Sequence, residues 1–397
     1  MAVVKKIING ILLGLIVALV LIWVLVEPPL SSPLGTSSLS RFLPFFPHLK
    51  TQKIVYGFLP YWNLKTATLQ PELTHLAYFA LSIDADGNIV TTVNGNAEPG
   101  YYQLQSEEFL AANQLTKTYG GKTEVVLSQF DNDTIEQFLS SPSAQTTFFQ
   151  AVDSLLLAYP FNGINVDIEY IGDAPPALRE RYTQFISQFR QHLNETYEDI
   201  QLTVDMYAAA SSKQMIWEVE KIAPLVDYIV VMAYDFHRSS SLRAGPVAPL
   251  FQKETSWKES INTYLKDFVK KTSPDKLLLG IPFYGYEWET TSQEPESFTL
   301  PQSGATASFK RVKELLTQKE ELEVVEHWDE NALAPYLSYI KNGRYYLVYY
   351  EDARSITYKL DYVNQLDLAG VAIWSLGYEG DSRELWEAVD NTLKIKN

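Results

Sequence analysis

Eight short apolar runs, separated by longer stretches that fit amphipathic helices, restrict the fold of this chain more than any other feature. The runs cover residues 53–62, 73–83, 123–130, 161–169, 200–208, 226–236, 276–286 and 368–377. Stretches such as 133–159 and 176–197 lie between them. Strands that alternate with helices indicate βαβ units and a parallel sheet, and eight such units predict a (β/α)8 barrel of the TIM type. We therefore predict an α/β protein with this barrel over residues 53–397.

The interval between the seventh and eighth runs is much longer than the others. It holds several strand-like segments and one helical stretch, and its Asn342-Gly343 pair is typical of a two-residue hairpin turn. A plain barrel needs roughly 250 residues, so the surplus needs a place outside it. We predict a small α+β insertion at about 289–350.

The N-terminus carries an unbroken apolar segment, residues 7–26, directly after Lys5 and Lys6. Its twenty residues contain no charge and are long enough to cross a bilayer as a helix. A cleaved signal peptide has a shorter apolar region and a small-x-small site, so we favour an uncleaved signal anchor over a cleaved signal or a core helix. The positive-inside rule then leaves residues 1–6 in the cytoplasm and the body outside the cell membrane, as in a single-pass protein.

Residues 27–52 are rich in proline and serine and keep no period of 2 or 3.6. We interpret them as a stalk between the membrane and the body.

Charge and cysteine content exclude several classes of function. The net charge is −16, and because residues 1–52 carry four basic side chains and one acidic one, the body carries −19. Such a body repels phosphate backbones, so we expect no nucleic-acid partner. The chain has no cysteine, which excludes disulfides and thiolate chemistry. Its five histidines show no metal-ligand spacing, and we predict neither a metal nor another cofactor.

The run at 161–169, FNGINVDIE, places Asn165, Asp167 and Glu169 on one face of a strand and apolar residues on the other. A half-exposed antiparallel strand has the same pattern. In a barrel, however, the polar face points inward, and Glu169 lies nearest the carboxyl-terminal end, where active sites of this fold are found. Buried carboxyl groups are unfavourable unless they are paired or hydrogen-bonded, so the pattern favours catalysis.

Five motifs in order resemble glycoside hydrolase family 18, the chitinase-like barrels. NGINVDIE at 162–169 is similar to the family's DGxDxDxE, and MAYDF at 232–236 to its Met-x-Tyr-Asp. AIWSLG at 372–377 and YGFLPYW at 56–62 match its eighth and first strands, and GIPFYGYEW at 280–288 resembles the bacterial spore and cell-wall N-acetylglucosaminidase branch. The resemblance covers the whole of residues 53–397.

Two departures accompany the resemblance. Asn162 and Asn165 stand where the usual pattern has aspartate, and the SxGG of strand three is reduced to Ser128-Gln129-Phe130. The final Asp-x-Glu is intact. An asparagine at the position of Asn165 also occurs in the cell-wall branch, so it does not imply loss of activity.

The resemblance implies a retaining hydrolase of β-1,4-linked N-acetylglucosamine glycans in which the substrate's acetamido group is the nucleophile. Glu169 is then the acid and base, Asp167 stabilises the oxazolinium, and Tyr234 donates to the acetamido carbonyl. Asp235 would contact sugar hydroxyls and Trp374 would form the floor, while a structural Tyr–Asp pair and a core tryptophan stay open as alternatives.

Simple electrostatics adds two expectations. Burial beside another carboxyl group should raise the pKa of Glu169, as a general acid needs. The amide of Asn165 can donate a hydrogen bond to Asp167 without adding a negative charge, and should keep Asp167 ionised.

Several alternatives remain open at this point. The rings of Tyr61, Trp62, Tyr286 and Trp288 can stack on sugars or pack in the core. A lectin-like barrel without activity, or a transglycosylase, would share these motifs. The sequence does not choose among peptidoglycan, chitin and another N-acetylhexosamine polymer, nor between endo and exo action, although the anchor favours the cell envelope. We expect a monomer.

Overall fold

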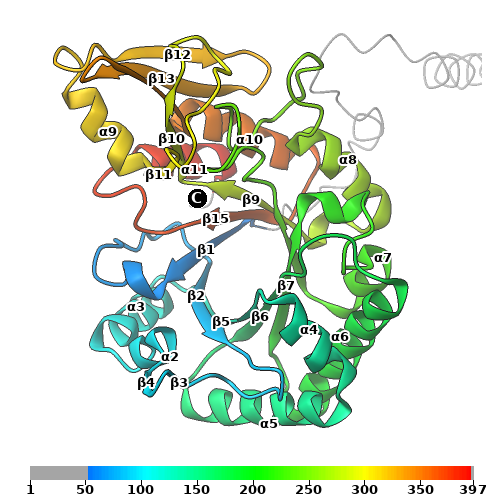
Figure 1. Ribbon diagram of the computed structural model, residues 1–397. Helices are drawn as coiled ribbons and strands as arrows, with labels where there is room; N and C mark the ends of the chain where they lie inside the picture. The colour runs from blue at the N-terminus through cyan, green and yellow to red at the C-terminus, as the bar shows by residue number, and fades with distance from the viewer. Residues whose placement is uncertain (1–51, 395–397) are drawn as a thin grey trace, which may run out of the picture. The chain divides into compact units, whose positions relative to one another are not determined.

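The computed structural model describes residues 52–394, and their centre is a closed barrel of eight parallel strands (Figure 1). The strands are β1 (Ile54–Pro60), β2 (His75–Ser82), β5 (Lys122–Gln129), β6 (Gly163–Ile168), β7 (Gln201–Tyr207), β8 (Tyr228–Met232), β9 (Leu277–Pro282) and β15 (Gly370–Trp374). Strand β1 pairs with both β2 and β15, which closes the ring. The predicted barrel is confirmed: seven strands fall within their predicted apolar runs, and β5 begins one residue before its run.

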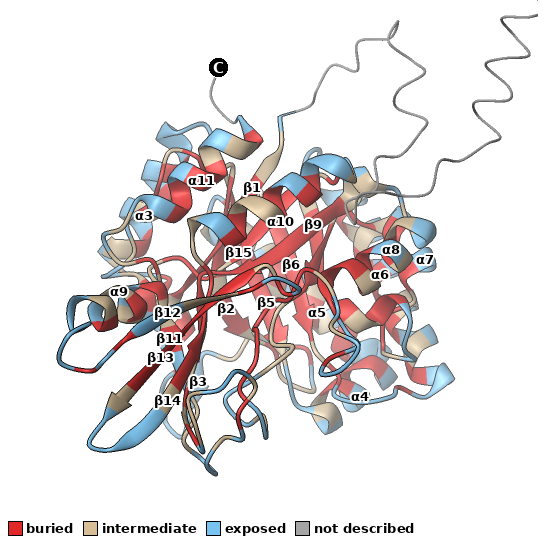
Figure 2. Cartoon of the chain, turned by 90° about the horizontal axis from the view of Figure 1, so that it is seen from above, coloured by how far each residue is buried: buried red, intermediate tan, exposed pale blue. Residues whose placement is uncertain are grey.

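Helices surround the barrel and bury one face each against it (Figure 2). They are α2 (Pro99–Gln103), α3 (Glu107–Thr118), α4 (Asn132–Ser140), α5 (Pro142–Ala158), α6 (Pro176–Thr196), α7 (Val219–Ile222), α8 (Ile261–Lys271), α10 (Ala353–Gln365) and α11 (Glu384–Leu393). The stretch 133–159 forms two helices instead of one. Pro142 lacks the N–H that a continuous helix needs, and the Ser141 side chain accepts a hydrogen bond from the Ala144 N–H (3.2 Å), starting α5.

Both faces of β6 are buried, unlike those of a half-exposed strand. Ile164, Val166 and Ile168 are at most 1% exposed, and Asn165 and Asp167 at most 2%. Strands of a parallel barrel lie between the helix ring and the barrel interior, which explains this double burial. The inward-facing side chains of β6 are therefore enclosed in the protein.

The insertion between β9 and β15 is a five-stranded antiparallel sheet with one helix, beside the barrel (Figure 1). The sheet order is β11 (Ala305–Ser308), β10 (Tyr284–Thr290), β14 (Arg344–Tyr349), β13 (Ala334–Lys341) and β12 (Val325–Asp329), and the helix is α9 (Phe309–Thr317). Strand β10 starts at Tyr284, so the sheet begins earlier than the expected residue 289. Asn342 and Gly343, both with positive φ, form the expected two-residue turn between β13 and β14.

Small elements complete the described chain. A hairpin of β3 (Thr92–Val93) and β4 (Asn96–Ala97) follows β2. Four 3-10 turns cover Tyr61–Asn63, Ala208–Ser211, Ala223–Leu225 and Pro274–Lys276. The predicted cytoplasmic segment 1–6, the span 7–26 and nearly all of the stalk 27–52 lie outside the described residues. Within residues 52–394, no helix has the length and apolar character needed to cross a membrane.

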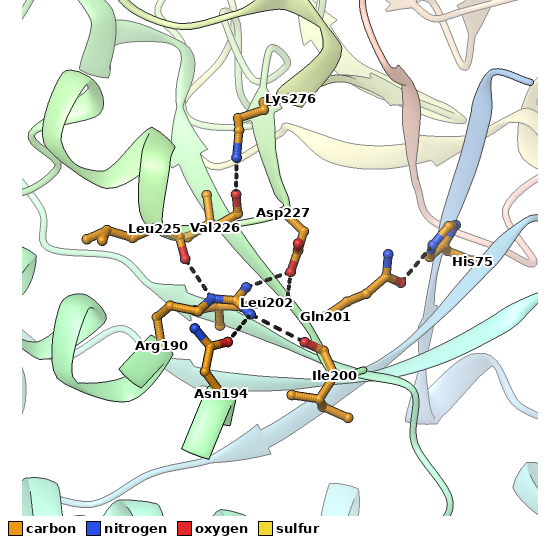
Figure 3. Close-up of polar contacts among 10 residues, drawn as sticks. All are labelled: His75, Arg190, Asn194, Ile200, Gln201, Leu202, Leu225, Val226, Asp227 and Lys276. Atoms are coloured by element: carbon orange, nitrogen blue, oxygen red, sulfur yellow. Dashed lines mark hydrogen bonds and ion pairs between the residues drawn. The ribbon is translucent and has the colours of Figure 1, made fainter. Parts of the chain in front are cut away.

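A polar cluster ties together the amino-terminal ends of several strands (Figure 3). Arg190 of α6 donates to the backbone oxygen of Leu225 (2.8 Å) and forms an ion pair with Asp227 (2.6 Å) just before β8. Lys276 donates to the oxygen of Val226 (2.5 Å), and His75 hydrogen-bonds Gln201 across the barrel (3.1 Å). Residues at this end of a TIM barrel generally serve stability.

Candidate active site

A pocket of about 310 Å³ opens at the carboxyl-terminal ends of the barrel strands. It is lined by Phe58, Phe79, Phe130, Asp167, Glu169, Asp205, Tyr207, Met232, Tyr234, Asp235, Arg238, Tyr284 and Trp374. Five of the predicted site residues are among them: Asp167, Glu169, Tyr234, Asp235 and Trp374. They come from the ends of β6, β8 and β15, so the barrel brings together motifs that lie far apart in the sequence.

Glu169 follows the last residue of β6 and faces the pocket while half-buried. Its backbone N–H donates to the oxygen of Gln129 (2.9 Å), which continues the β5–β6 ladder by one residue. The Tyr207 hydroxyl donates to its carboxylate. Burial raises the pKa of Glu169, and the Tyr207 hydroxyl and the Arg238 charge partly offset that rise. A carboxyl group with a raised pKa is suited to donate a proton near neutral pH.

Asp167 lies deeper than Glu169 and is only 2% exposed. Its pKa is well above the usual range, first because of burial, then because of the charges of Glu169 and Asp205. We expected Asp167 to stay ionised; burial beside two carboxyl groups instead favours its neutral form. Asp167 and Glu169 line the same pocket, so a proton on one of them affects the pKa of the other.

Asn165 does not donate to Asp167, and that part of the prediction is wrong. Its side-chain amide donates to Asp205 Oδ1 (2.8 Å) and to the Tyr56 hydroxyl (3.1 Å). Tyr56 in turn donates to Glu124 (2.8 Å). Asp205 was not predicted, because none of the five motifs covers the run at 200–208. The alternation of Thr203, Asp205 and Tyr207 along the next strand is a signal that would have identified it.

Tyr234 and Asp235 follow β8 and reach the pocket together. Asp235 has φ of 61°, a left-handed conformation, and its carboxylate accepts hydrogen bonds from the hydroxyls of Tyr284 (2.5 Å) and Tyr286 (2.9 Å). Arg238 Nε donates to the Asp235 backbone oxygen (3.3 Å). Asp235 is therefore fixed at the pocket rim by two tyrosines of the insertion sheet.

The six predicted aromatic and polar binding residues divide into three groups. Asp235 and Trp374 line the pocket, and the Trp374 ring meets Phe79 edge-on at 4.6 Å. Tyr61 and Trp62 line a second hollow of about 610 Å³, and Trp62, 48% exposed, lies 6.1 Å from the same Phe79 ring. Trp288 and Tyr286 line neither of these two hollows.

Trp288 and Tyr286 are packing and positioning residues in the structure. Trp288 is fully buried and its indole N–H donates to the oxygens of Arg238 and Ser239 (both 3.2 Å), so it cannot stack on a sugar. Tyr286 is 8% exposed and is held by Asp235. Both lie on β10, which leaves the barrel after Pro282, and this departure is not visible in the residue pattern.

Three further pocket residues were not predicted from the sequence: Tyr207, Arg238 and Tyr284. Each contacts a predicted residue directly.

In the part of the chain that the structure describes, no group of three His, Asp or Glu side chains could hold a metal ion.

A barrel with two carboxyl groups and several aromatic rings in a pocket at its carboxyl-terminal end defines a candidate glycosidase. The sequence model of Glycosyl hydrolases family 18 matches residues 47–379, so the chain belongs to that family. Members of this family that are similar to this chain in sequence or in structure include glycosidases.

Related proteins support this assignment. The uncharacterized glycosylase YvbX of Bacillus subtilis is 26% identical over 66% of this chain and 70% of its own. Chitotriosidase-1 of Mus musculus is 26% identical over 78% of this chain and 68% of its own. The cortical fragment-lytic enzyme of Bacillus anthracis is 24% identical over 79% and 66%. The chain is thus a glycosidase that resembles both chitinases and spore cell-wall enzymes.

Solved structures share the fold. The Group IV chitinase of Ostrinia furnacalis has a TM-score of 0.75 at 22% identity, covering 86% of this chain and all of that one. The spore cortex-lytic enzyme SleL of Bacillus megaterium has a TM-score of 0.66 at 20% identity, covering 86% and 74%.

Proposed function

We propose that this protein is a membrane-anchored, extracytoplasmic hydrolase that cleaves β-1,4 bonds of N-acetylglucosamine-containing glycans by substrate-assisted catalysis. The observation that carries the proposal is the pocket shared by Asp167 and Glu169, in which both carboxyl groups have raised pKa values. An inverting glycosidase needs its two carboxyl groups roughly 6.5–9.5 Å apart, with water between them. Asp167, which is deeply buried and favours its neutral form, is unsuited to be the general base that activates that water.

The same pair is unsuited to the other common mechanism. A retaining enzyme with a protein nucleophile needs an ionised carboxylate facing the anomeric carbon. Asp167 is the deeper group, and burial and its neighbours favour its protonated form. A nucleophile supplied by the substrate, the carbonyl oxygen of a 2-acetamido group, resolves this difficulty and sets the substrate class.

The steps follow from the residues in the pocket. Glu169 protonates the leaving glycosidic oxygen while the acetamido oxygen attacks the anomeric carbon and forms an oxazolinium. Asp167 accepts the acetamido N–H and stabilises the positive charge of the oxazolinium. Tyr234 donates to the acetamido oxygen, and Trp374 supports the sugar from below. Glu169 then removes a proton from water, which opens the oxazolinium with retention.

A comparison of two aryl glycosides tests the substrate class. The full-length chain should release the aryl group from an aryl N-acetylglucosaminide oligomer and not from the matching glucoside, which lacks an internal nucleophile. Comparable turnover of the glucoside would show that a protein carboxylate is the nucleophile. Binding of both glycans without cleavage of either, nor of peptidoglycan, would favour a lectin-like barrel.

Peptidoglycan is the polymer that we favour. Two supporting observations are the relatives from Bacillus, which include a putative sporulation-specific glycosylase and cortical fragment-lytic enzymes, and the apolar segment 7–26 that would place the enzyme at the envelope. Incubation with purified peptidoglycan and with chitin oligomers, followed by mass spectrometry, separates the two substrates and shows endo or exo action and transglycosylation.

The anchor predicts a definite behaviour of the mature protein. If residues 7–26 span the membrane uncleaved, the mature chain begins near Met1 and leaves the membrane only with detergent. N-terminal sequencing of the mature protein checks this, and a terminus downstream of Glu27 would instead define a secreted enzyme.

A further inference from the structure

Asp205 is a buried carboxyl group in the pocket that the mechanism above leaves without a role. It is 2% exposed and lies on β7, next to the strand that carries the catalytic pair. The β6–β7 register pairs Val166 with Val204, which places Asp205 alongside Asp167. A carboxyl group in such a place is unfavourable unless neighbouring groups stabilise it.

The hydrogen bonds of Asn165 connect Asp205 to the catalytic strand. Asn165 uses one N–H of its amide for Asp205 Oδ1 and the other for the Tyr56 hydroxyl. Two buried acceptors nearby in sequence, Asn165 Oδ1 and Asp167 Oδ1, have no hydrogen-bond partner in the described part of the chain. A proton on Asp167 makes its carboxyl group a hydrogen-bond donor. This agrees with the neutral form of Asp167 that its neighbours favour.

Every strand packed around Asp205 contributes to its electrostatic surroundings. The titratable groups that interact with it are Tyr56 of β1, Glu124 of β5, Asp167 and Glu169 of β6, Tyr182 of α6 and Tyr234 after β8. No basic side chain appears among them. The Asn165 amide is the one group in this set that favours the charged form of Asp205.

We propose that Asp205 is a positioning residue that supplies, from β7, the third carboxyl group of the centre and controls the proton on Asp167. The family pattern places an aspartate at the position of Asn165, on β6 itself. In this chain the amide of Asn165 occupies that position and binds a carboxylate from the neighbouring strand. The carboxyl group has moved between strands and still lies beside Asp167.

Three variants of the full-length chain test this exchange. Asp205→Asn removes the charge with little change of shape, and Asn165→Asp adds a carboxyl group on β6. The double variant Asn165→Asp/Asp205→Asn moves the carboxyl group to the family position. Glu379→Gln is the matched control, because Glu379 is an equally buried carboxyl group that lies outside the pocket lining and does not contribute to the pKa of Asp167 or Asp205.

The expected results have opposite signs for the two single variants. A negative neighbour raises the pKa of Asp167, so Asp205→Asn should move the titration midpoint of Asp167 to lower pH, and Asn165→Asp to higher pH, by roughly one unit or more. The limb of the pH–rate profile that Asp167 governs should move in the same direction as its titration midpoint. The kcat of Asp205→Asn should fall roughly 10²-fold with little change in KM. The double variant should recover most of the wild-type pH dependence and kcat, and Glu379→Gln should change neither.

Two readouts separate this inference from the proposed function on which its activity test rests. Carbon-13 labelling of aspartate side chains gives the titration curves of Asp167 and Asp205 by NMR without any substrate. In the wild type, strong coupling between the two groups should split each curve into two steps. Independent single-step titrations in the wild type, an unmoved Asp167 midpoint in Asp205→Asn, or a double variant no nearer to wild type than the single ones would overturn the proposal. An inactive wild type with coupled titrations would refute only the substrate.

Discussion

At the scale of single residues, Glu169 combines the exposure and the pKa that a general acid needs. It reaches the pocket, while burial raises its pKa and the Tyr207 hydroxyl fixes its orientation. Glu169→Gln keeps the size and the acceptor for Tyr207 but removes the proton. We expect kcat on an N-acetylglucosamine oligomer to fall roughly 10²–10⁴-fold, the usual contribution of a general acid, with glycan affinity retained.

Initial rates and calorimetric titration with the same oligomer check both parts of this prediction. Glu180→Gln is the control, because Glu180 is an exposed carboxylate on α6 and its replacement should leave kcat within about twofold. Activity of Glu169→Gln above about a tenth of wild type would assign the acid to another group in the pocket.

At the scale of elements, the strands follow from local patterns, but the site depends on contacts between strands. The alternation in 161–169 predicts β6 and its inward carboxyl groups, since the period of a strand is a property of the backbone. The pairing of Asn165 with Asp205 depends on the β6–β7 register, which no single run contains. Trp288 belongs to the core because β10 joins the insertion sheet, and a list of aromatic residues does not reveal that change of sheet.

The cluster around Arg190 gives a prediction at the same scale (Figure 3). Arg190 joins α6 to the segments before β7 and β8 through Ile200, Leu225 and Asp227. Arg190→Met keeps the aliphatic stem and leaves these acceptors without their donor. Hydrogen bonds to charged groups contribute about 1.5–3 kcal/mol, and Asp227 is partly exposed, so we expect the free energy of unfolding to fall by about 1–2 kcal/mol.

Chemical denaturation measures this loss, and activity at saturating substrate provides the second readout. The cluster lies at the amino-terminal end of the barrel, so kcat should stay within about twofold of wild type. Lys319→Met is the matched control, because both side chains of its ion pair with Glu326 are exposed and the pair should contribute less than about 0.5 kcal/mol. A large loss of kcat in folded Arg190→Met would show that this end of the barrel couples to the pocket.

At the scale of the whole molecule, two buried groups make stability depend on pH in opposite directions. Burial lowers the pKa of His75 to about 4, although its hydrogen bond to Gln201 acts against that shift. The native state therefore disfavours charged His75, and its contribution is complete above the unfolded value near 6.5 and is lost as the pH falls toward 4. Burial raises the pKa of Glu124 to about 7, so the stability linked to this group is complete below about 4.5 and is lost as the pH rises toward 7.

Glu124→Gln isolates the second effect. Glutamine keeps an acceptor for the Tyr56 hydroxyl and cannot ionise, so the variant should gain stability relative to wild type as the pH rises from 4.5 to 7. A shift of this size corresponds to a relative gain on the order of 3 kcal/mol. Denaturant unfolding of both proteins at several pH values measures the difference. A gap that stays constant across the range would show that Glu124 keeps its ordinary pKa, and that its barrel surroundings stabilise the charged carboxylate.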